Sequence, residues 1–494
     1  MNLVLAVVEK NTKNAVWANE MLNNKALVSV LLGIIWSIPF FFENTWPIAA
    51  LSLLFVVNAL CEYDSKELVK YGFIVVFTQN IIAVYWMKAL SPVAWILVAV
   101  ILASECSLFC YLFSLLRKTI KDKKNTLWII PFAWYVYEYT RGLGMFRWSW
   151  TNLGNWLTWK SENMTYASVV GLYGLSFFIM LFAVSLFSSL RKNDKMSKTI
   201  CIFSLFFICG ITFQENKLKS TEKATIRIVS NGKSALDRWD ADALSEIREF
   251  YSTGSSNYKS KPQVILWPES AIVSEYPSEV VSEISSEAKV PILYGAFIND
   301  SENFHNVYGV SYPNRGHLKN PYEKRFLVPM GEFVIFRKLV EEAMPDYGWP
   351  VRDVSPGDGG EDIKIGNLNI GTLLCWEALF PGAARTQVSE KTDFLVIASN
   401  TSWFSQNATT QFSRLIKMRA IESGRKVVSV ITGGGSSIVD INGDVLFDSP
   451  MGEHLFKNKE LQIEKKDTVF NHFGDFLLLI PSLLICFLNI KIKS

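Results

Sequence analysis

Long apolar segments dominate the first 213 residues of the chain and return near its end. Segments of spanning or near-spanning length cover residues 26–42, 46–61, 70–90, 92–116, 126–140, 166–190, 198–213 and 474–490. A membrane-crossing helix needs roughly 20 apolar residues. A buried core helix explains any one segment, but not seven in succession. Because 50% of the 494 residues are hydrophobic, the composition also favours a membrane protein. The sequence therefore predicts eight transmembrane helices.

Lysine and arginine residues are distributed unevenly between the connections of these segments. One alternating set of connections carries sixteen of them, whereas the other set carries only Lys88, Arg141, Arg147 and Lys160. Positive residues accumulate on the cytoplasmic side of membrane proteins. Both termini are therefore predicted in the cytoplasm, and residues 214–469 on the outer face. In a bacterium that face is the periplasmic side of the inner membrane.

Residues 214–469 have a different character, with short β-type runs separated by Gly, Pro, Asn and Asp. The runs are QVILWPES, VPILYGAFI, FHNVYGVSY, LNIGTLLC, DFLVIASN, KVVSVIT and SSIVDINGDVLF. The last run contains a hairpin signal at Asn442–Gly443, and residues 410–425 have helical periodicity. Such alternation predicts a layered α/β domain. The chain is thus divided into a membrane domain, an outer α/β domain and a final helix, at residues 1–213, 214–469 and 470–494.

Charge and cysteine content exclude several kinds of function. The net charge is only +3, so a nucleic-acid-binding surface is not expected. Cys375 is the only one of the seven cysteines in the outer region, which therefore has no internal disulfide. No spacing of Cys and His residues resembles a metal site, and neither a metal nor a cofactor is expected.

Three reactive side chains each follow or adjoin an apolar strand. Glu269 follows VILWP, Lys324 precedes RFLVPMGEF and Cys375 ends GTLL. Taken singly, a solvated glutamate, a surface lysine and a core cysteine are the more ordinary interpretations. Residues at strand ends, however, project into the cleft above a sheet. The three together therefore predict an active site.

This set of side chains provides what acyl transfer through a thioester requires. A carboxylate such as Glu269 removes the proton of a cysteine and makes it a nucleophile. A fixed ammonium, here Lys324, stabilises the thiolate and the oxyanion of the tetrahedral intermediate. The backbone N–H of Trp376 offers a second oxyanion donor. No histidine is needed.

At these residues the sequence resembles the nitrilase superfamily and, within it, the membrane-integrated apolipoprotein N-acyltransferases. LWPES matches the family motif of the general base, Glu269, and CWE that of the nucleophile, Cys375. YEKRFLVPMGEF matches the motif that carries the lysine, Lys324, and a supporting carboxylate, Glu332. The resemblance implies that Trp376 and Glu377 shape the pocket. It also implies an αββα sandwich outside a multi-pass helical membrane domain.

Weaker motif matches extend over the rest of the chain. DRWD and SNTSWF place Trp239 and Trp403 on family tryptophans, and EYTRG, LYGLSF and FGD match the helical arm. The stretch 141–159 on the predicted outer face carries four tryptophans, typical of an aromatic belt at headgroup depth. A substrate-shaping role is the alternative. On the substrate-shaping interpretation, we expect Arg147 and Trp148 to contact the substrate.

Several positions depart from the family pattern. Trp376 replaces the usual tyrosine, Phe412 stands where histidine often occurs, and the glycines of ITGGGSS, Gly433–Gly435, replace a Thr-Asn-Asn-Gly pattern. IRIVSNG lacks the usual Gln-Gly-Asn. These departures affect the pocket and its specificity, and not the three reactive residues.

The resemblance implies a two-step reaction. Cys375 accepts an acyl chain from a phospholipid, with phosphatidylethanolamine as the expected donor, and passes it to the amine of a diacylglyceryl-cysteine at a lipoprotein N-terminus. Two alternatives remain open. A membrane-tethered amidase would use the same side chains on a small amide, and a transporter with an inactive domain would have the same helices.

Overall fold

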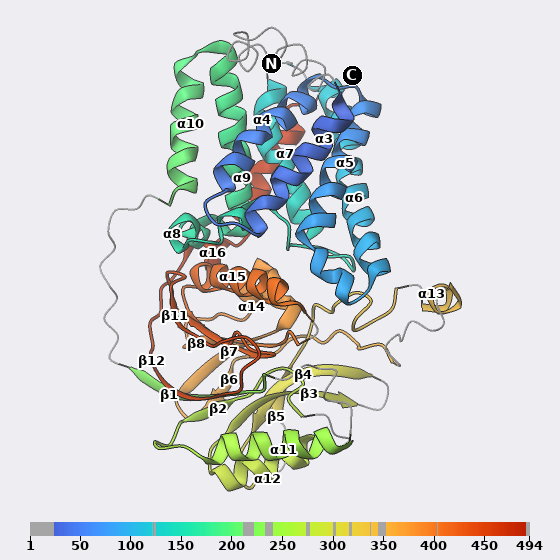
Figure 1. The fold of residues 1–494 in the computed structure, drawn as a ribbon. Coiled ribbons are helices and arrows are strands. Elements are labelled where there is room, and N and C mark those ends of the chain that lie inside the picture. Colours follow the sequence, from blue (N-terminus) through green and yellow to red (C-terminus); the bar gives the residue numbers. More distant parts are fainter. Residues whose placement is uncertain are drawn as a thin grey trace.

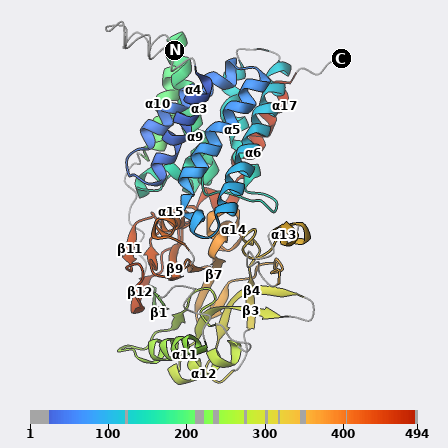
Figure 2. The same ribbon diagram turned by 45° about the vertical axis from the view of Figure 1, so that its right-hand side comes forward.

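A helical bundle and a two-sheet domain make up the molecule (Figure 1). The computed structural model describes residues 24–120, 122, 125–210, 222–232, 241–272, 277–299, 303–315, 319–335, 337–343, 352–402 and 404–490. The two-sheet domain lies wholly on one side of the bundle in both views (Figures 1 and 2). The predicted domain boundary at 213/214 lies outside the described residues.

Every apolar segment that the sequence predicts as a helix is helical. The helices are α3 (Lys25–Ser37), α4 (Trp46–Glu62), α5 (Ser65–Ala83), α6 (Pro92–Thr119), α7 (Thr126–Arg141), α9 (Ala167–Lys192), α10 (Lys195–Ile208) and α17 (Phe476–Leu488). Short helices between them are η1 (Ile38–Phe40), η2 (Tyr85–Ala89), η4 (Leu153–Leu157) and α8 (Ser161–Met164). Among the described helices, α6 and α9 are long and apolar enough to cross a membrane. The helix prediction is confirmed, and the crossing of a membrane by all eight stays a prediction.

Local signals account for where several of these helices begin and end. The side chains of Asp64, Ser91 and Asp194 cap α5, α6 and α10 by accepting a hydrogen bond from a backbone N–H three residues later. Basic residues, including Arg117 and Arg191, lie in the last turns of α6 and α9. There they interact favourably with the negative end of the helix dipole.

The second part of the molecule contains two six-stranded sheets. One has the order β12-β1-β2-β3-β4-β5 and the other β11-β10-β9-β8-β7-β6. The first comprises β1 (Lys223–Ser230), β2 (Val264–Leu266), β3 (Ile292–Asn299), β4 (Phe304–Ser311), β5 (Lys319–Glu323) and β12 (Leu455–Gln462). The second comprises β6 (Ile363–Ile365), β7 (Leu368–Leu374), β8 (Phe394–Asn400), β9 (Lys426–Thr432), β10 (Ser437–Val439) and β11 (Val445–Asp448). All predicted strands are present, including the hairpin at Asn442–Gly443.

Helices cover the outer face of each sheet. Helices α11 (Ala241–Ser256) and α12 (Pro277–Ala288) cover the first sheet, while α14 (Pro381–Thr386) and α15 (Gln406–Ser423) lie between the second sheet and the bundle (Figure 1). Helix α13 (Arg337–Ala343) projects to one side, and α16 (Val469–Phe473) precedes α17. Apolar residues of both sheets form one buried core between them. The predicted αββα sandwich is confirmed.

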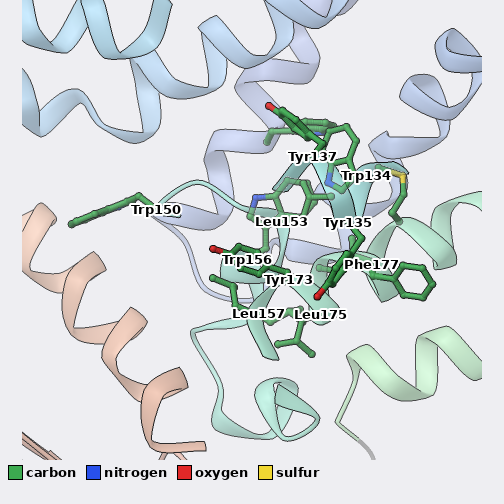
Figure 3. Packing of buried hydrophobic residues seen from close by; sticks show 14 of the residues in the cluster. Trp134, Tyr135, Tyr137, Trp150, Leu153, Trp156, Leu157, Tyr173, Leu175 and Phe177 are labelled. Carbon is green, nitrogen blue, oxygen red and sulfur yellow. The ribbon is translucent and has the colours of Figure 1, made fainter. Parts of the chain in front are cut away.

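Tryptophans of the 141–159 stretch join the bundle to the sandwich. Trp148, Trp150 and Trp156 are only 5%, 1% and 0% exposed. Trp150 reaches towards α15, where its Nε1 donates to Gln411 Oε1 at 2.7 Å, whereas Trp156 packs inside the bundle (Figure 3). These three rings are therefore not an exposed interfacial belt, whereas their depth relative to a bilayer stays a prediction. They pack against helices that are distant in sequence, so their rings are not exposed to surrounding bilayer lipid.

A break in α9 provides a second connection between the two parts. Gly171 has φ 66° and ψ −176°, so the helix is interrupted there. The freed N–H of Leu172 donates to Glu422 Oε1 of α15 at 2.8 Å. A Cβ atom at Gly171 would lie 2.3 Å from a ring carbon of Phe470. Only glycine satisfies both the backbone conformation and the space.

We predict that Gly171→Ala lowers the free energy of unfolding by about 1–3 kcal/mol, because it combines a strained backbone with a clash. Gly382→Ala is the matched control, since a Cβ atom there meets nothing within 4 Å. The measurement is the thermal unfolding midpoint of the purified full chain. Equal midpoints for Gly171→Ala and Gly382→Ala would contradict the prediction.

Candidate active site

The three predicted reactive residues converge from both sheets. Glu269 lies just beyond β2, Lys324 follows β5 directly, and Cys375 follows β7 directly as the first residue of η6 (Cys375–Leu379). Lys324 Nζ lies 3.0 Å from Glu269 Oε1. The charges of both residues act on the Cys375 thiol. The structure thus brings together three side chains that are spread over more than a hundred residues of the chain.

Lys324 is completely enclosed between two carboxylates. Its side chain is 1% exposed, and Nζ donates to Glu269 Oε1 at 3.0 Å and to Glu332 Oε1 at 2.9 Å. Burial lowers the pKa of Lys324, but the charges of the two glutamates outweigh burial and hold this pKa well above its ordinary value. Lys324 is therefore a permanent ammonium and cannot serve as the base.

Asn306 of β4 completes this arrangement and was not found from the sequence. Its Nδ2 donates to Glu269 Oε1 and to Glu332 Oε1, each at 2.8 Å. Its backbone oxygen accepts a hydrogen bond from Lys324 N at 2.9 Å. The sequence signal that points to Asn306 is its place as a polar residue inside the apolar run FHNVYGVSY. In the structure Asn306 is only 1% exposed. A buried amide usually has a specific partner.

Cys375 has a backbone conformation that is rare for its residue type. It is 8% exposed and has φ +47°, in the left-handed region. Burial and the charge of Glu269 raise the pKa of the thiol, and Lys324 opposes them only in part. The resting sulfur is therefore a protonated thiol, which needs a base at the moment of reaction.

Two neighbouring positions have the same kind of strain. Ser270, directly after Glu269, has φ 51°, and Met330, two residues before Glu332, has φ 64°. Among the described residues, seven non-glycine residues have positive φ, and three of them adjoin or belong to this site. Strain of this kind concentrates at functional sites, where the surrounding structure maintains it.

Glu377 connects the turn that begins at Cys375 to the segment that carries Lys324. Its side chain is completely buried, and burial raises its pKa. Oε1 accepts from the N–H groups of Arg325 and Phe326, at 2.9 and 3.3 Å. Oε2 accepts from Tyr322 O–H at 2.7 Å and Leu374 N–H at 2.9 Å. The motif predicted Glu377, whereas Tyr322 is its unpredicted partner.

Trp376, the residue after Cys375, packs among aromatic side chains. We call this group the aromatic wall; its other members are Trp148, Trp150, Phe380 and Phe326. Its ring centroid lies 5.5 Å from that of Trp148 and 6.2 Å from that of Trp150. On the other side, Phe380 lies 6.1 Å from Trp376 and 5.4 Å from Phe326. The tryptophan thus packs against both the bundle loop and the sandwich. Of the predicted substrate-contacting residues, Trp148 lies in this wall.

The other predicted substrate-contacting residues lie at the edge of the aromatic wall or outside the described residues. The guanidinium of Arg147 lies 3.8 Å from the Phe326 ring centroid. Trp239 and Trp403 fall outside the described residues. Within the described chain, no cluster of three or more His, Cys, Asp or Glu side chains is arranged to hold a metal ion. The site as described therefore consists of a thiol, an ammonium and buried carboxylates.

Comparison with known proteins identifies relatives for both parts of the chain. Residues 32–185 match the family model of the apolipoprotein N-acyltransferase N-terminal domain, and residues 239–459 match that of carbon-nitrogen hydrolases. The apolipoprotein N-acyltransferase of Wigglesworthia glossinidia brevipalpis is 26% identical over 95% of this chain and 98% of its own. That of Geobacter metallireducens is 24% identical over 91% of both chains.

Solved structures match about half of the chain. The crystal structure of the carbon-nitrogen hydrolase from Helicobacter pylori G27 matches 49% of this chain and 90% of its own, with 13% identity and a TM-score of 0.39. An amidase from Nesterenkonia sp. matches 51% of this chain and 95% of its own, with 14% identity and a TM-score of 0.34.

We predict that Glu377→Gln destabilises the protein by about 1–3 kcal/mol, because either orientation of the amide turns an N–H towards groups that themselves donate. Tyr322→Phe is the comparison, since it removes one of the four donors and leaves the carboxylate with the other three. Denaturant or thermal unfolding of both variants measures the difference. If Glu377→Gln unfolds like the wild type, the carboxylate does not hold this turn.

Proposed function

Because the chain belongs to the apolipoprotein N-acyltransferase family, we propose that it transfers a phospholipid acyl chain, through a thioester at Cys375, to the N-terminal diacylglyceryl-cysteine of lipoproteins. The observation that supports this proposal is the buried group of Glu269, Lys324 and Cys375. It lies beside the tryptophans that join the sandwich to the bundle. A small-amide hydrolase would not need the bundle domain matched at residues 32–185.

The first half-reaction begins from the protonated thiol. As Cys375 Sγ attacks the ester carbonyl, Glu269 accepts the thiol proton. The ammonium of Lys324 stabilises the negative charge that develops on the carbonyl oxygen, and the N–H of Trp376 is a further donor. Collapse of the intermediate expels the lysophospholipid alkoxide, which takes the proton from Glu269. The products are an acyl thioester and a lysophospholipid, with phosphatidylethanolamine as the expected donor.

The second half-reaction uses the same groups in the same places. The neutral α-amine of the acceptor attacks the thioester carbonyl, and Glu269 accepts its proton. Lys324 again stabilises the oxyanion. When the C–S bond breaks, the leaving thiolate of Cys375 takes the proton from Glu269. Glu332 keeps Lys324 charged and in place throughout, and Trp239, Trp403 and Trp148 are proposed to contact the substrates.

The proposed substrates and the apolar helices both support a membrane location for the protein. Both substrates are lipids, so the site must lie at a bilayer surface. Helices α6 and α9 are long and apolar enough to cross a membrane, and α3, α4 and α17 are shorter apolar helices. The proposal is a multi-pass protein of the bacterial inner membrane with the sandwich in the periplasm. The distribution of Lys and Arg supports this orientation.

We predict that wild-type protein mixed with acyl-labelled phospholipid acquires label on the peptide that contains Cys375, measured by mass spectrometry in a single turnover. Cys375→Ala should abolish labelling. Glu269→Gln should slow it by about two to four orders of magnitude, the usual effect of losing a general base. Cys486→Ala is the control for thiol content, and its rate should not change. Near-normal labelling of Cys375→Ala would exclude the assigned nucleophile.

A second prediction concerns orientation. Reporter fusions after residue 122 and after residue 230 should report opposite compartments, with the first in the cytoplasm and the second in the periplasm. The reason is that one positively charged connection precedes α7, whereas residue 230 ends β1 of the sandwich. Activity of a compartment-specific reporter, such as alkaline phosphatase, is the measurement. Two fusions in one compartment would refute the arrangement of helices.

A further inference from the structure

Two arginines from different parts of the molecule contact one aromatic ring beside the active site. The guanidinium carbon of Arg147 lies 3.8 Å from the ring centroid of Phe326, and that of Arg325 lies 5.6 Å from it. Arg147 belongs to the loop after α7, and Arg325 directly follows Lys324. Bundle and sandwich thus each contribute one fixed positive charge at the same place.

The positive charge of this pair is only partly balanced. Glu377 is the carboxylate that acts on both, but it is buried, accepts four other hydrogen bonds and lies 4.0 Å from Arg325 Nε. That distance is too long for a hydrogen bond. Partial burial lowers the pKa of Arg147, the charge of Arg325 lowers it further, and Glu377 opposes the change only in part. An anion placed here would relieve the repulsion.

The residues before Arg147 indicate where this pair lies relative to a bilayer. Leu143, Met145 and Phe146 are 53%, 55% and 39% exposed. Exposed apolar side chains enter the acyl region of a membrane, and a neighbouring arginine then reaches the phosphate level. In the proposed orientation these residues lie on the outer face, the same side as the sandwich. The arginines therefore lie at headgroup depth.

The aromatic wall connects the arginines with the nucleophile. Phe326, which both arginines contact, packs on Phe380, and Phe380 packs on Trp376, the residue after Cys375. A phospholipid carries its phosphate on the same glycerol as its ester carbonyls. A cation at one end of the wall and a thiol at the other therefore fit a single donor molecule. The planar guanidinium group also matches the oxygens of a phosphate.

We propose that Arg147 and Arg325 together bind the phosphate of the donor phospholipid, an inference that rests on the proposed function. The reacting end of the acceptor, a diacylglyceryl-cysteine, has no phosphate. The pair therefore selects the substrate of the first half-reaction and has no part in the second. Because the phosphate is common to all phospholipids, the pair recognises the donor class and not a particular headgroup.

The test compares an ester donor that carries a phosphate-containing headgroup with one that has a free hydroxyl in its place. Single-turnover thioester formation at Cys375 is measured in the purified full chain with phosphatidylethanolamine and with diacylglycerol that carries the same acyl chains. The wild type should prefer the phospholipid. Arg147→Gln and Arg325→Gln should each slow the phospholipid reaction by about tenfold or more, the scale of a charge-assisted hydrogen bond. The rate with diacylglycerol should stay within about twofold of the wild-type rate, so the variants lose the preference for phospholipid over diacylglycerol.

Controls separate this binding role from a structural one. Arg325→Gln retains the backbone N–H bond to Glu377, and Lys160→Gln removes a charge from another part of the same proposed face without changing the preference. Aminolysis of a preformed thioester by a diacylglyceryl-cysteine peptide should be unaffected in both arginine variants. Phosphatidylglycerol should behave like phosphatidylethanolamine.

Several outcomes would overturn the inference. Equal losses with both donors would make the arginines structural, and an unchanged preference would exclude a phosphate contact. Inhibition of the wild type by inorganic phosphate, without any effect of the substitutions on donor preference, would indicate a free-anion site. A wild type that forms the thioester without preferring phospholipid would refute the inference alone. A wild type that forms no thioester with any ester donor would refute the proposed function itself.

Discussion

The ammonium of Lys324 between two buried carboxylates is the interaction on which the rest of the site depends. Its partners come from separate elements, Glu269 beyond β2 and Glu332 after the Lys324 segment, and Asn306 of β4 bridges both carboxylates. Leaving one member of such a buried group without its partner costs about 3–5 kcal/mol. The charge that we propose to stabilise an oxyanion therefore also holds these elements together. Catalytic and structural roles cannot be separated at this lysine.

The nucleophile is fixed by its neighbours and not by its own contacts. Glu377 binds the turn to the Lys324 segment through four hydrogen bonds, and Trp376 packs against Trp148 and Trp150 of the bundle loop. Cys375 lies between these two residues and the end of β7, in a left-handed conformation that the surroundings must maintain. The thiol thus keeps one position relative to both the sandwich and the bundle. The proposed function, in which substrates arrive from a bilayer, needs that fixed relation.

The sequence was sufficient for features that depend on local pattern. Apolar length predicted all eight helices, and alternation predicted the central strands. Motifs at strand ends predicted that Glu269, Lys324 and Cys375 form one site, and the structure brings these three residues together. Features that depend on distant pairing were missed. β1 pairs with β12 from near the end of the chain. Tyr322 donates a hydrogen bond to Glu377 from the other sheet, and Trp150 donates one to Gln411 of α15. No local pattern carries such information, because each contact forms only when segments that are distant in sequence pack together.

Burial of Cys375 imposes opposite demands on the two half-reactions. A thioester must survive until the acceptor arrives, and a sulfur that is 8% exposed beside an aromatic wall is protected from water. The same burial raises the pKa of the thiol, so the resting enzyme has no thiolate to attack the donor. In the proposed reaction Glu269 resolves this conflict, because it removes the proton only as the new bond forms. The base is thus required by the burial that preserves the intermediate, and a more exposed, more acidic cysteine would attack readily but lose its acyl group to water.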